Sequence, residues 1–162
     1  MASEVIQILP GDLTDPRVVD LLNIHVTSAL AESPPESCHA FDVSGLQRPE
    51  ISFWAAWVGP ELGGVGALMD LGEGHGEVKS MHTARAARGR GIGSAMLRHI
   101  IATARERGYR RLSLETGSMD YFTPARALYA RYGFIECGPF GSYVLDPNSV
   151  FLTLDLAVER GD

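Results

Sequence analysis

The sequence has few cysteines and no long apolar run, and each absence excludes a class of protein. Its two cysteines, Cys38 and Cys137, lack metal-ligand spacing and fit reduced thiols. No stretch approaches the roughly 20 apolar residues of a membrane span, which excludes an integral membrane protein. The first residues, MASEVIQILPGDL, show no basic start followed by an apolar run. We therefore expect a cytoplasmic protein that has no membrane partner.

Basic residues are scarce in the first half of the chain. Residues 1–80 hold three of them, Arg17, Arg48 and Lys79, against twelve acidic residues. Residues 81–162 hold eleven arginines against eight acidic residues. The net charge of −6 makes nucleic acid an unfavourable partner. The asymmetry suggests two ligands of opposite charge, although solvated surface charges explain the same pattern.

Length and composition predict a single globular domain over residues 1–162, with 45% hydrophobic and 21% charged residues. Strands are expected at 4–10, 51–58, 64–69, 76–83, 111–116, 134–140 and 150–156; helices are expected from Asp15-Pro16 onward, at 91–107, and at 123–132 with Thr123 as N-cap. Hairpins followed by one strand–helix–strand crossover imply a mixed α/β (α+β) fold. Its central sheet is expected to be mixed, mostly antiparallel and six- to seven-stranded, with flanking helices. The irregular stretch 32–49 contains three prolines and is typical of a functional or mobile loop.

The most informative motif is Arg88-Gly89-Arg90-Gly91-Ile92-Gly93, between an expected strand and an expected amphipathic helix. Alternate glycines let the backbone approach a ligand and turn successive N–H groups into one concavity. The helix start adds unpaired N–H groups, and the arginines add positive charge. Together they predict a pyrophosphate site. No Gly-Lys pair exists for a Walker loop, and the Rossmann glycine pattern fails at Ser94 or Met96, so ATP and NAD are disfavoured.

The chain here resembles the GCN5-related N-acetyltransferases. Their acetyl-CoA loop reads [QR]-x-x-G-x-[GA], which Arg88-x-x-Gly91-x-Gly93 matches at every fixed position. Their second signature, an apolar helix with a tyrosine running into Gly-Phe, is similar to ARALYARYGF at residues 125–134. The segments 33–37, 114–118 and 147–151 further resemble an uncharacterised bacterial branch of this family. One departure is Phe122, where many members place an asparagine.

The resemblance implies acetyl-CoA as cosubstrate, a GCN5-related fold whose crossover carries the acetyl-CoA loop, and a thioester beside the backbone around Met81–Thr83. The residues that it assigns to the cofactor are Met81, His82, Thr83, Arg88, Gly89, Arg90, Gly91, Ile92, Gly93 and Ser94. It also puts Glu77 where several relatives carry a catalytic glutamate. Strand alternation predicts that Glu77, Lys79, Met81 and Thr83 point one way.

Acetyl transfer to an amine needs a base, a stabilised oxyanion and a proton for the departing thiolate. Glu77 is the candidate base, and a solvated residue near a strand start is the alternative. Glu115 is a second candidate, either as base or as a holder of a cationic substrate. A main-chain N–H near Met81 is the expected oxyanion donor, because no side-chain donor is obvious there.

Tyr129 is the candidate acid, because a phenol pKa of about 10 and a thiol pKa of about 8.5 make the proton transfer nearly balanced. Core packing is the alternative for Tyr129, and Tyr132 is a weaker candidate acid. Among the five histidines His39 alone is expected to contact substrate. None has the spacing of a metal ligand, so no metal is assigned.

These observations predict an acetyl-CoA-dependent N-acetyltransferase that acts on a primary amine of a small molecule by direct transfer in a ternary complex. A non-catalytic acyl-CoA-binding regulator and an acetyltransferase of protein N-termini or lysines remain as alternatives. A homodimer is compatible with the resemblance, but nothing in the sequence displays an interface.

Overall fold

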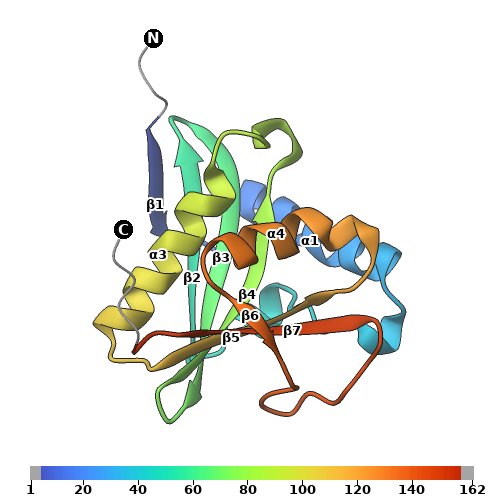
Figure 1. Cartoon of the computed structure of the whole chain (residues 1–162). Coiled ribbons are helices and arrows are strands. Elements are labelled where there is room, and N and C mark those ends of the chain that lie inside the picture. Colours follow the sequence, from blue (N-terminus) through green and yellow to red (C-terminus); the bar gives the residue numbers. More distant parts are fainter. Residues whose placement is uncertain (1–4, 158–162) are drawn as a thin grey trace.

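Seven strands form one sheet in the order β1-β2-β3-β4-β5-β7-β6 (Figure 1). The computed structural model describes residues 5–157. The strands are β1 (Ile6–Pro10), β2 (Ile51–Val58), β3 (Glu61–Gly72), β4 (His75–Thr83), β5 (Arg111–Gly117), β6 (Ile135–Cys137) and β7 (Ser149–Asp155). β4 and β5 are parallel, and all other neighbours are antiparallel. The expected mixed, mostly antiparallel sheet is therefore confirmed.

Helices cover both faces of the sheet (Figure 1). They are α1 (Pro16–Glu32), α2 (Val43–Leu46), α3 (Ile92–Glu106) and α4 (Thr123–Arg131). The predicted apolar stripe of α3 packs with Leu68, Val78 and Leu112 in one core cluster, which also holds Tyr129 of α4. α1 and α2 pack on the other face, against Val65 and Ala67. No helix within residues 5–157 is long and apolar enough to cross a membrane.

Four of the expected boundaries need correction. The strand expected at 64–69 extends over Glu61–Gly72 as β3. Thr123 is not the N-cap of α4, because the 3-10 turn Asp120–Phe122 runs directly into the helix and Phe122 takes that place. The strand expected at 134–140 is limited to β6, because its pairing with β7 ends at Cys137 and Pro139 follows. The strand expected at 4–10 begins at Ile6, and Glu4 lies outside the described residues.

β4 and β5 separate soon after they meet. They pair at three positions only, His75 to Glu77 on β4 against Arg111 to Ser113 on β5. β4 then continues to Thr83 while β5 turns away with β7, as Figure 1 shows. Within the described part of the chain, the later part of β4 therefore has no strand neighbour on its β5 side. This splay leaves main-chain groups of β4 available to a ligand.

An extra residue in β4 changes which way its side chains point. Lys79 pairs with Ala67 and His82 with Val65, so Ser80 and Met81 together face the single residue Gly66. Ser80 takes the left-handed backbone conformation, with φ 56°. This bulge reverses the alternation of side chains.

The expectation that four β4 side chains share a face is therefore wrong. Glu77 and Lys79 point to the α1 side of the sheet. Met81 packs with the α3 cluster, and Thr83 lies near the start of α3, next to Gly93. The bulge thus divides the strand between the two faces.

Candidate active site

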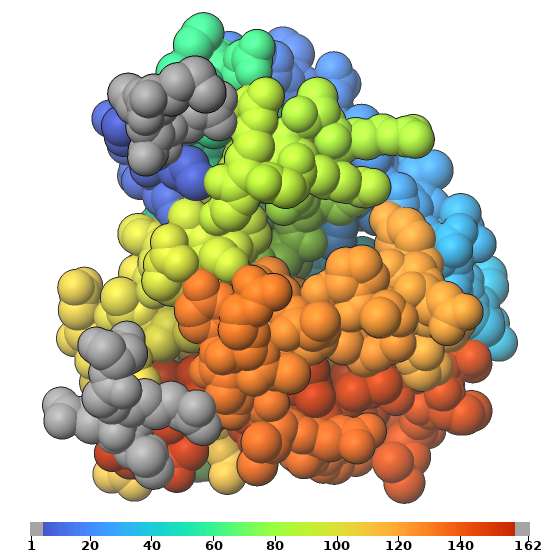
Figure 2. Space-filling model, turned by 45° about the horizontal axis from the view of Figure 1, so that its top comes forward, coloured from blue at the N-terminus to red at the C-terminus, as the bar shows by residue number. Residues whose placement is uncertain are grey.

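A cavity of about 610 Å³ lies where β4 and β5 separate. Figure 2 shows its mouth as a hollow between the green segment after β4, the orange α4 region and the blue end of α1. One end is lined by the start of α3 and by Arg88. The other end is lined by Glu77, Glu115 and the segment after α1. The two ends fit the two oppositely charged ligands that the charge asymmetry suggested.

The start of α3 offers the main-chain donors that a pyrophosphate needs. Gly91 is the helix N-cap with φ 81°, and Gly89 has φ 80°, conformations that favour glycine. No side chain caps the helix and its first turn has no acidic residue, so the N–H groups of Ile92, Gly93 and Ser94 are not consumed by a capping side chain. Arg88 lines the cavity and is exposed. Arg90 is exposed outside the lining.

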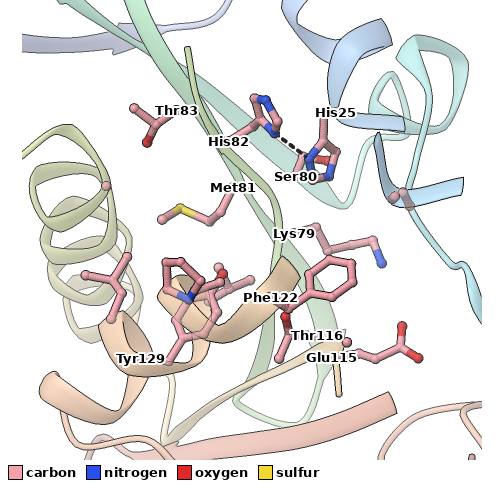
Figure 3. Close-up of a pocket in the computed structure, with 18 of the residues that line it drawn as sticks. His25, Lys79, Ser80, Met81, His82, Thr83, Glu115, Thr116, Phe122 and Tyr129 are labelled. Atoms are coloured by element: carbon pink, nitrogen blue, oxygen red, sulfur yellow. Dashed lines mark hydrogen bonds between the residues drawn. The ribbon is translucent and has the colours of Figure 1, made fainter. Parts of the chain in front are cut away.

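Because of the bulge, the three β4 residues expected at the thioester point to different faces of the sheet. Figure 3 shows Met81 and Thr83 pointing to the α3 side, whereas His82 points away from them to His25 of α1. The Nδ1 atoms of His25 and His82 are 3.1 Å apart, so one ring donates to the other. Burial, and then the neighbouring His82, lowers the pKa of His25 to about 4. Burial, followed by the charge of Arg88, also lowers the pKa of His82. The His82 ring is therefore turned away from the α3 side, so that only its backbone is placed to meet a ligand there.

Glu77 lies in a buried hydrogen-bond network. The Tyr143 hydroxyl donates to its Oε2 at 2.6 Å, and the Lys79 ammonium donates to the same oxygen at 3.1 Å. Lys79 Nζ also lies 4.1 Å from the centre of the Phe41 ring. Only 4% of Glu77 is exposed, so the alternative of a solvated residue is wrong. Burial, and then the Glu77 carboxylate, raises the pKa of Tyr143.

The two expected substrate residues, His39 and Glu115, lie in contact. His39 Nδ1 is 2.8 Å from both carboxylate oxygens of Glu115. The Ser149 hydroxyl donates to Glu115 Oε2 at 2.8 Å. The His39 ring packs edge-on against Tyr143, with ring centres 5.0 Å apart. A carboxylate–imidazole pair therefore faces the cavity at its acidic end.

Tyr129 packs in the core, as the alternative predicted, and it also lines the cavity, so its role as the acid stays a prediction. Burial raises the pKa of its hydroxyl to about 12. The nearly balanced proton transfer expected from ordinary values is therefore not what the structure provides. Tyr132 accepts a hydrogen bond from Arg98 at 2.9 Å. Phe122 lines the cavity and its ring fills the space beside Gly117, where a Cβ would come within 2.2 Å.

The stretch expected to be functional forms the roof of the acidic end. We call residues 33–42 the roof segment; Ser37, Cys38, His39 and Phe41 of this segment line the cavity. Ser37 donates to Asp146 at 2.5 Å, which fastens the roof segment to the turn before β7. Sequence reasoning missed Tyr143 and treated Lys79, the only lysine of the chain, merely as a neighbour of Glu77. Among residues 5–157, no group of three or more His, Cys, Asp or Glu side chains could hold a metal ion.

Comparison with known proteins gives matches over most of the chain. The Acetyltransferase (GNAT) family model matches residues 18–134. The Bacillus subtilis protein described as uncharacterized N-acetyltransferase YsnE is 53% identical over 90% of this chain and 96% of its own length. The Escherichia coli protein described as uncharacterized N-acetyltransferase YedL is 49% identical over 90% of this chain and 91% of its own length. An IAA acetyltransferase from Azospirillum brasilense is 42% identical over 74% of this chain and 77% of its own length.

Solved structures share the fold. A Klebsiella pneumoniae protein described as a putative acyl-CoA N-acyltransferase superposes with a TM-score of 0.76 at 30% identity, covering 94% of this chain and 98% of its own. A GNAT acetyltransferase from Elizabethkingia anophelis, solved with acetyl-CoA bound, gives a TM-score of 0.65 at 20% identity. The match covers 93% of this chain and 97% of that protein.

Proposed function

Since the chain belongs to the acetyltransferase (GNAT) family, whose cosubstrate is acetyl-CoA, we propose that it acetylates the primary amine of a small cationic molecule. The transfer is direct, within a complex of enzyme, acetyl-CoA and amine. One observation carries the proposal. The same cavity is lined at one end by the glycine-rich start of α3 and at the other by Glu77 and Glu115. Both substrates can therefore meet in it.

The cofactor end suits a diphosphate followed by a thioester. Main-chain N–H groups from Ile92 to Ser94 and the Arg88 guanidinium would hold the diphosphate of acetyl-CoA. The unpaired edge of β4 near Met81 offers main-chain donors for the rest of the cofactor and for the acetyl oxygen. Acetyl-CoA supplies an acetyl group activated as a thioester. The chain supplies position, charge and proton transfer.

The acceptor end suits a small cation. Glu77 and Glu115 bring two carboxylates to it, and the Lys79 ammonium offsets only one of them. The roof segment covers this end and is fastened to the opposite turn by Ser37, which limits the size of the acceptor. A protein lysine or N-terminus would need an open groove. The name of the IAA acetyltransferase relative supports a small acceptor over a protein, without bearing on the charge of the acceptor.

Tyr129 is proposed to serve the departing sulfur. With a pKa of about 12 its hydroxyl stays protonated at neutral pH. Complete transfer to a thiolate, whose conjugate acid has a pKa of about 8.5, would cost about 5 kcal/mol. The hydroxyl therefore donates a hydrogen bond to the sulfur and passes on a proton that comes from the reacting amine, so that Tyr129 itself ends unchanged.

The proposal is tested by measuring thiol release from acetyl-CoA with amino acids, polyamines and aminoglycosides as acceptors. A peptide with a free lysine tests the alternative protein acceptor. We expect release with at least one small amine and none with the peptide. Calorimetric binding of acetyl-CoA without thiol release over the whole panel would instead identify a regulator that binds the cofactor. The Arg88→Glu variant serves as control, because it should lose both binding and release.

A further inference from the structure

We propose that His39, oriented by Glu115, is the base that takes the proton from the acceptor ammonium. The inference rests on the proposed function, which it deepens by naming the proton acceptor. Three observations carry it: the hydrogen bonds that fix the His39 ring, the engagement of Glu77 elsewhere, and the access of His39 to both cavity and solvent.

The hydrogen bonds determine which nitrogen of His39 is basic. Nδ1 lies 2.8 Å from both oxygens of Glu115, so the proton of the neutral ring resides on Nδ1. Ser149 donates to Glu115 at 2.8 Å and holds the carboxylate in place. Nε2 is then left as the unprotonated nitrogen. A carboxylate that orients an imidazole and stabilises its cation is a recurring arrangement for general bases.

Glu77 is a poorer proton acceptor for geometric reasons. Its Oε2 accepts from both Lys79 and Tyr143. Protonation of this carboxylate would leave the Lys79 ammonium, 7% exposed, without its counter-ion, which is costly in a buried site. Glu77 is therefore better suited to holding Lys79 and Tyr143 in place than to cycling a proton.

His39 reaches both the substrate and the solvent. His39 belongs to the roof segment and lines the cavity. Its side chain is 39% exposed, whereas that of Glu115 is 10% exposed. A proton collected in the cavity can thus leave to water. Its charged or titratable neighbours come from several elements; they are Glu115 on β5, Tyr143 and Asp146 in the segment before β7, and the Glu77–Lys79 pair that Tyr143 contacts on β4.

His39 Nε2 takes one proton from the acceptor ammonium and becomes imidazolium, and the amine nitrogen is left with its lone pair. That nitrogen forms a bond to the acetyl carbonyl carbon, and the carbon–sulfur bond breaks with its electron pair on sulfur. The second nitrogen proton reaches the sulfur through the Tyr129 hydroxyl, giving a thiol. The imidazolium then returns its proton to water.

Nitrogen NMR of the full-length protein with acetyl-CoA bound tests the geometry without a reaction. In the wild type we expect the long-range imidazole spectrum of His39 to show protonated Nδ1 and bare Nε2 above neutral pH. The Glu115→Gln variant should shift the ring towards the other tautomer or a mixture, because the amide no longer requires a proton on Nδ1. A wild-type ring with its proton on Nε2 would overturn the proposal.

Kinetics with the fastest acceptor of the amine panel tests the chemistry. His39→Gln should lower kcat at pH 7 by about 100-fold or more, with calorimetric acetyl-CoA affinity unchanged. The deficit should shrink as pH approaches the pKa of the amine, where free amine needs no base. Added imidazole should partly restore His39→Ala. The matched control is His75→Gln. His75 lies on β4, its ring hydrogen-bonds the Ser113 hydroxyl, and it does not line the cavity.

The outcomes separate the two proposals. A His39→Gln enzyme within threefold of wild type at pH 7, together with a Glu77→Gln enzyme that is inactive, would overturn the role of His39 and leave the proposed function standing. A wild-type enzyme that releases no thiol with any amine would overturn the proposed function. In that case the nitrogen spectrum alone decides whether the His39–Glu115 pair has the tautomer of a base.

Discussion

Acidification is expected to destabilise the protein chiefly through the imidazole of His25, whose pKa is lowered to about 4. The ring lies between α1 and β4 and shares a hydrogen bond with His82. Burial is the main reason why its pKa falls from 6.5 to about 4, and the neighbouring His82 and Lys79 lower it further. The folded protein therefore keeps His25 neutral at a pH where the unfolded chain protonates it.

The sign and size of the effect follow from proton linkage. Between pH 6.5 and pH 4 the unfolded chain binds more protons at this site, so the free energy of unfolding falls as pH falls. Above pH 6.5 the contribution is constant. The full pKa difference corresponds to about 3 kcal/mol, of which about 2 kcal/mol is lost by pH 5. These are upper bounds, because His25 keeps some exposure.

Urea unfolding of wild type and His25→Asn between pH 7 and pH 5 measures this contribution. The asparagine amide can still pair with His82 but does not titrate. We expect the wild type to lose about 2 kcal/mol more than the variant over this range. Ile24→Asn, at an exposed neighbour on the same helix, should follow the wild type. Parallel curves for wild type and His25→Asn would refute the linkage argument.

Three further changes test residues that line the cavity. Tyr129→Phe should lower kcat by about 100-fold with calorimetric acetyl-CoA affinity unchanged, and unaltered turnover would remove Tyr129 from the mechanism. Arg88→Glu should weaken acetyl-CoA binding by at least about tenfold, or 1.4 kcal/mol. Arg105→Glu, in the last turn of α3, should bind as the wild type does. Gly117→Ala should cost about 1–3 kcal/mol in urea unfolding. Its Cβ would meet the Phe122 ring at 2.2 Å, so a loss that persists unchanged in a Phe122→Leu background would contradict this cause.

Local signals were sufficient for most of the scaffold. The apolar spacing of α3 and the Asp15-Pro16 start of α1 depend on neighbours within one helical turn, and both elements appear where expected. β2 has the predicted bounds for the same reason. The glycine-rich loop that is proposed to hold the cofactor could also be recognised in the sequence, because its glycines, its arginines and the helix start are contiguous.

The acceptor end could be predicted only as separate residues. His39 and Glu115 were both expected to bind substrate, but 76 positions separate them and no periodicity relates a proline-rich loop to a distant strand. Tyr143 is 66 positions from Glu77, in a segment whose course is set by the end of β6. Contacts of this kind depend on how loops cross a completed sheet, which short-range patterns do not encode.

The bulge at Ser80 gives one strand two differently oriented sets of side chains, as the two ligands of the proposed function require. With strict alternation, Met81 and Thr83 would share a face with Glu77 and Lys79. The proposed cofactor contacts and the proposed acceptor contacts would then compete for one side of the sheet. The extra residue turns Met81 and Thr83 towards α3 while Glu77 and Lys79 stay beneath the roof segment. Where β4 and β5 separate, the cavity connects the two faces of the sheet beside this bulge. The separation of the acidic end from the end lined by Arg88 and the start of α3 therefore follows from the left-handed Ser80 and from the three-residue pairing between β4 and β5.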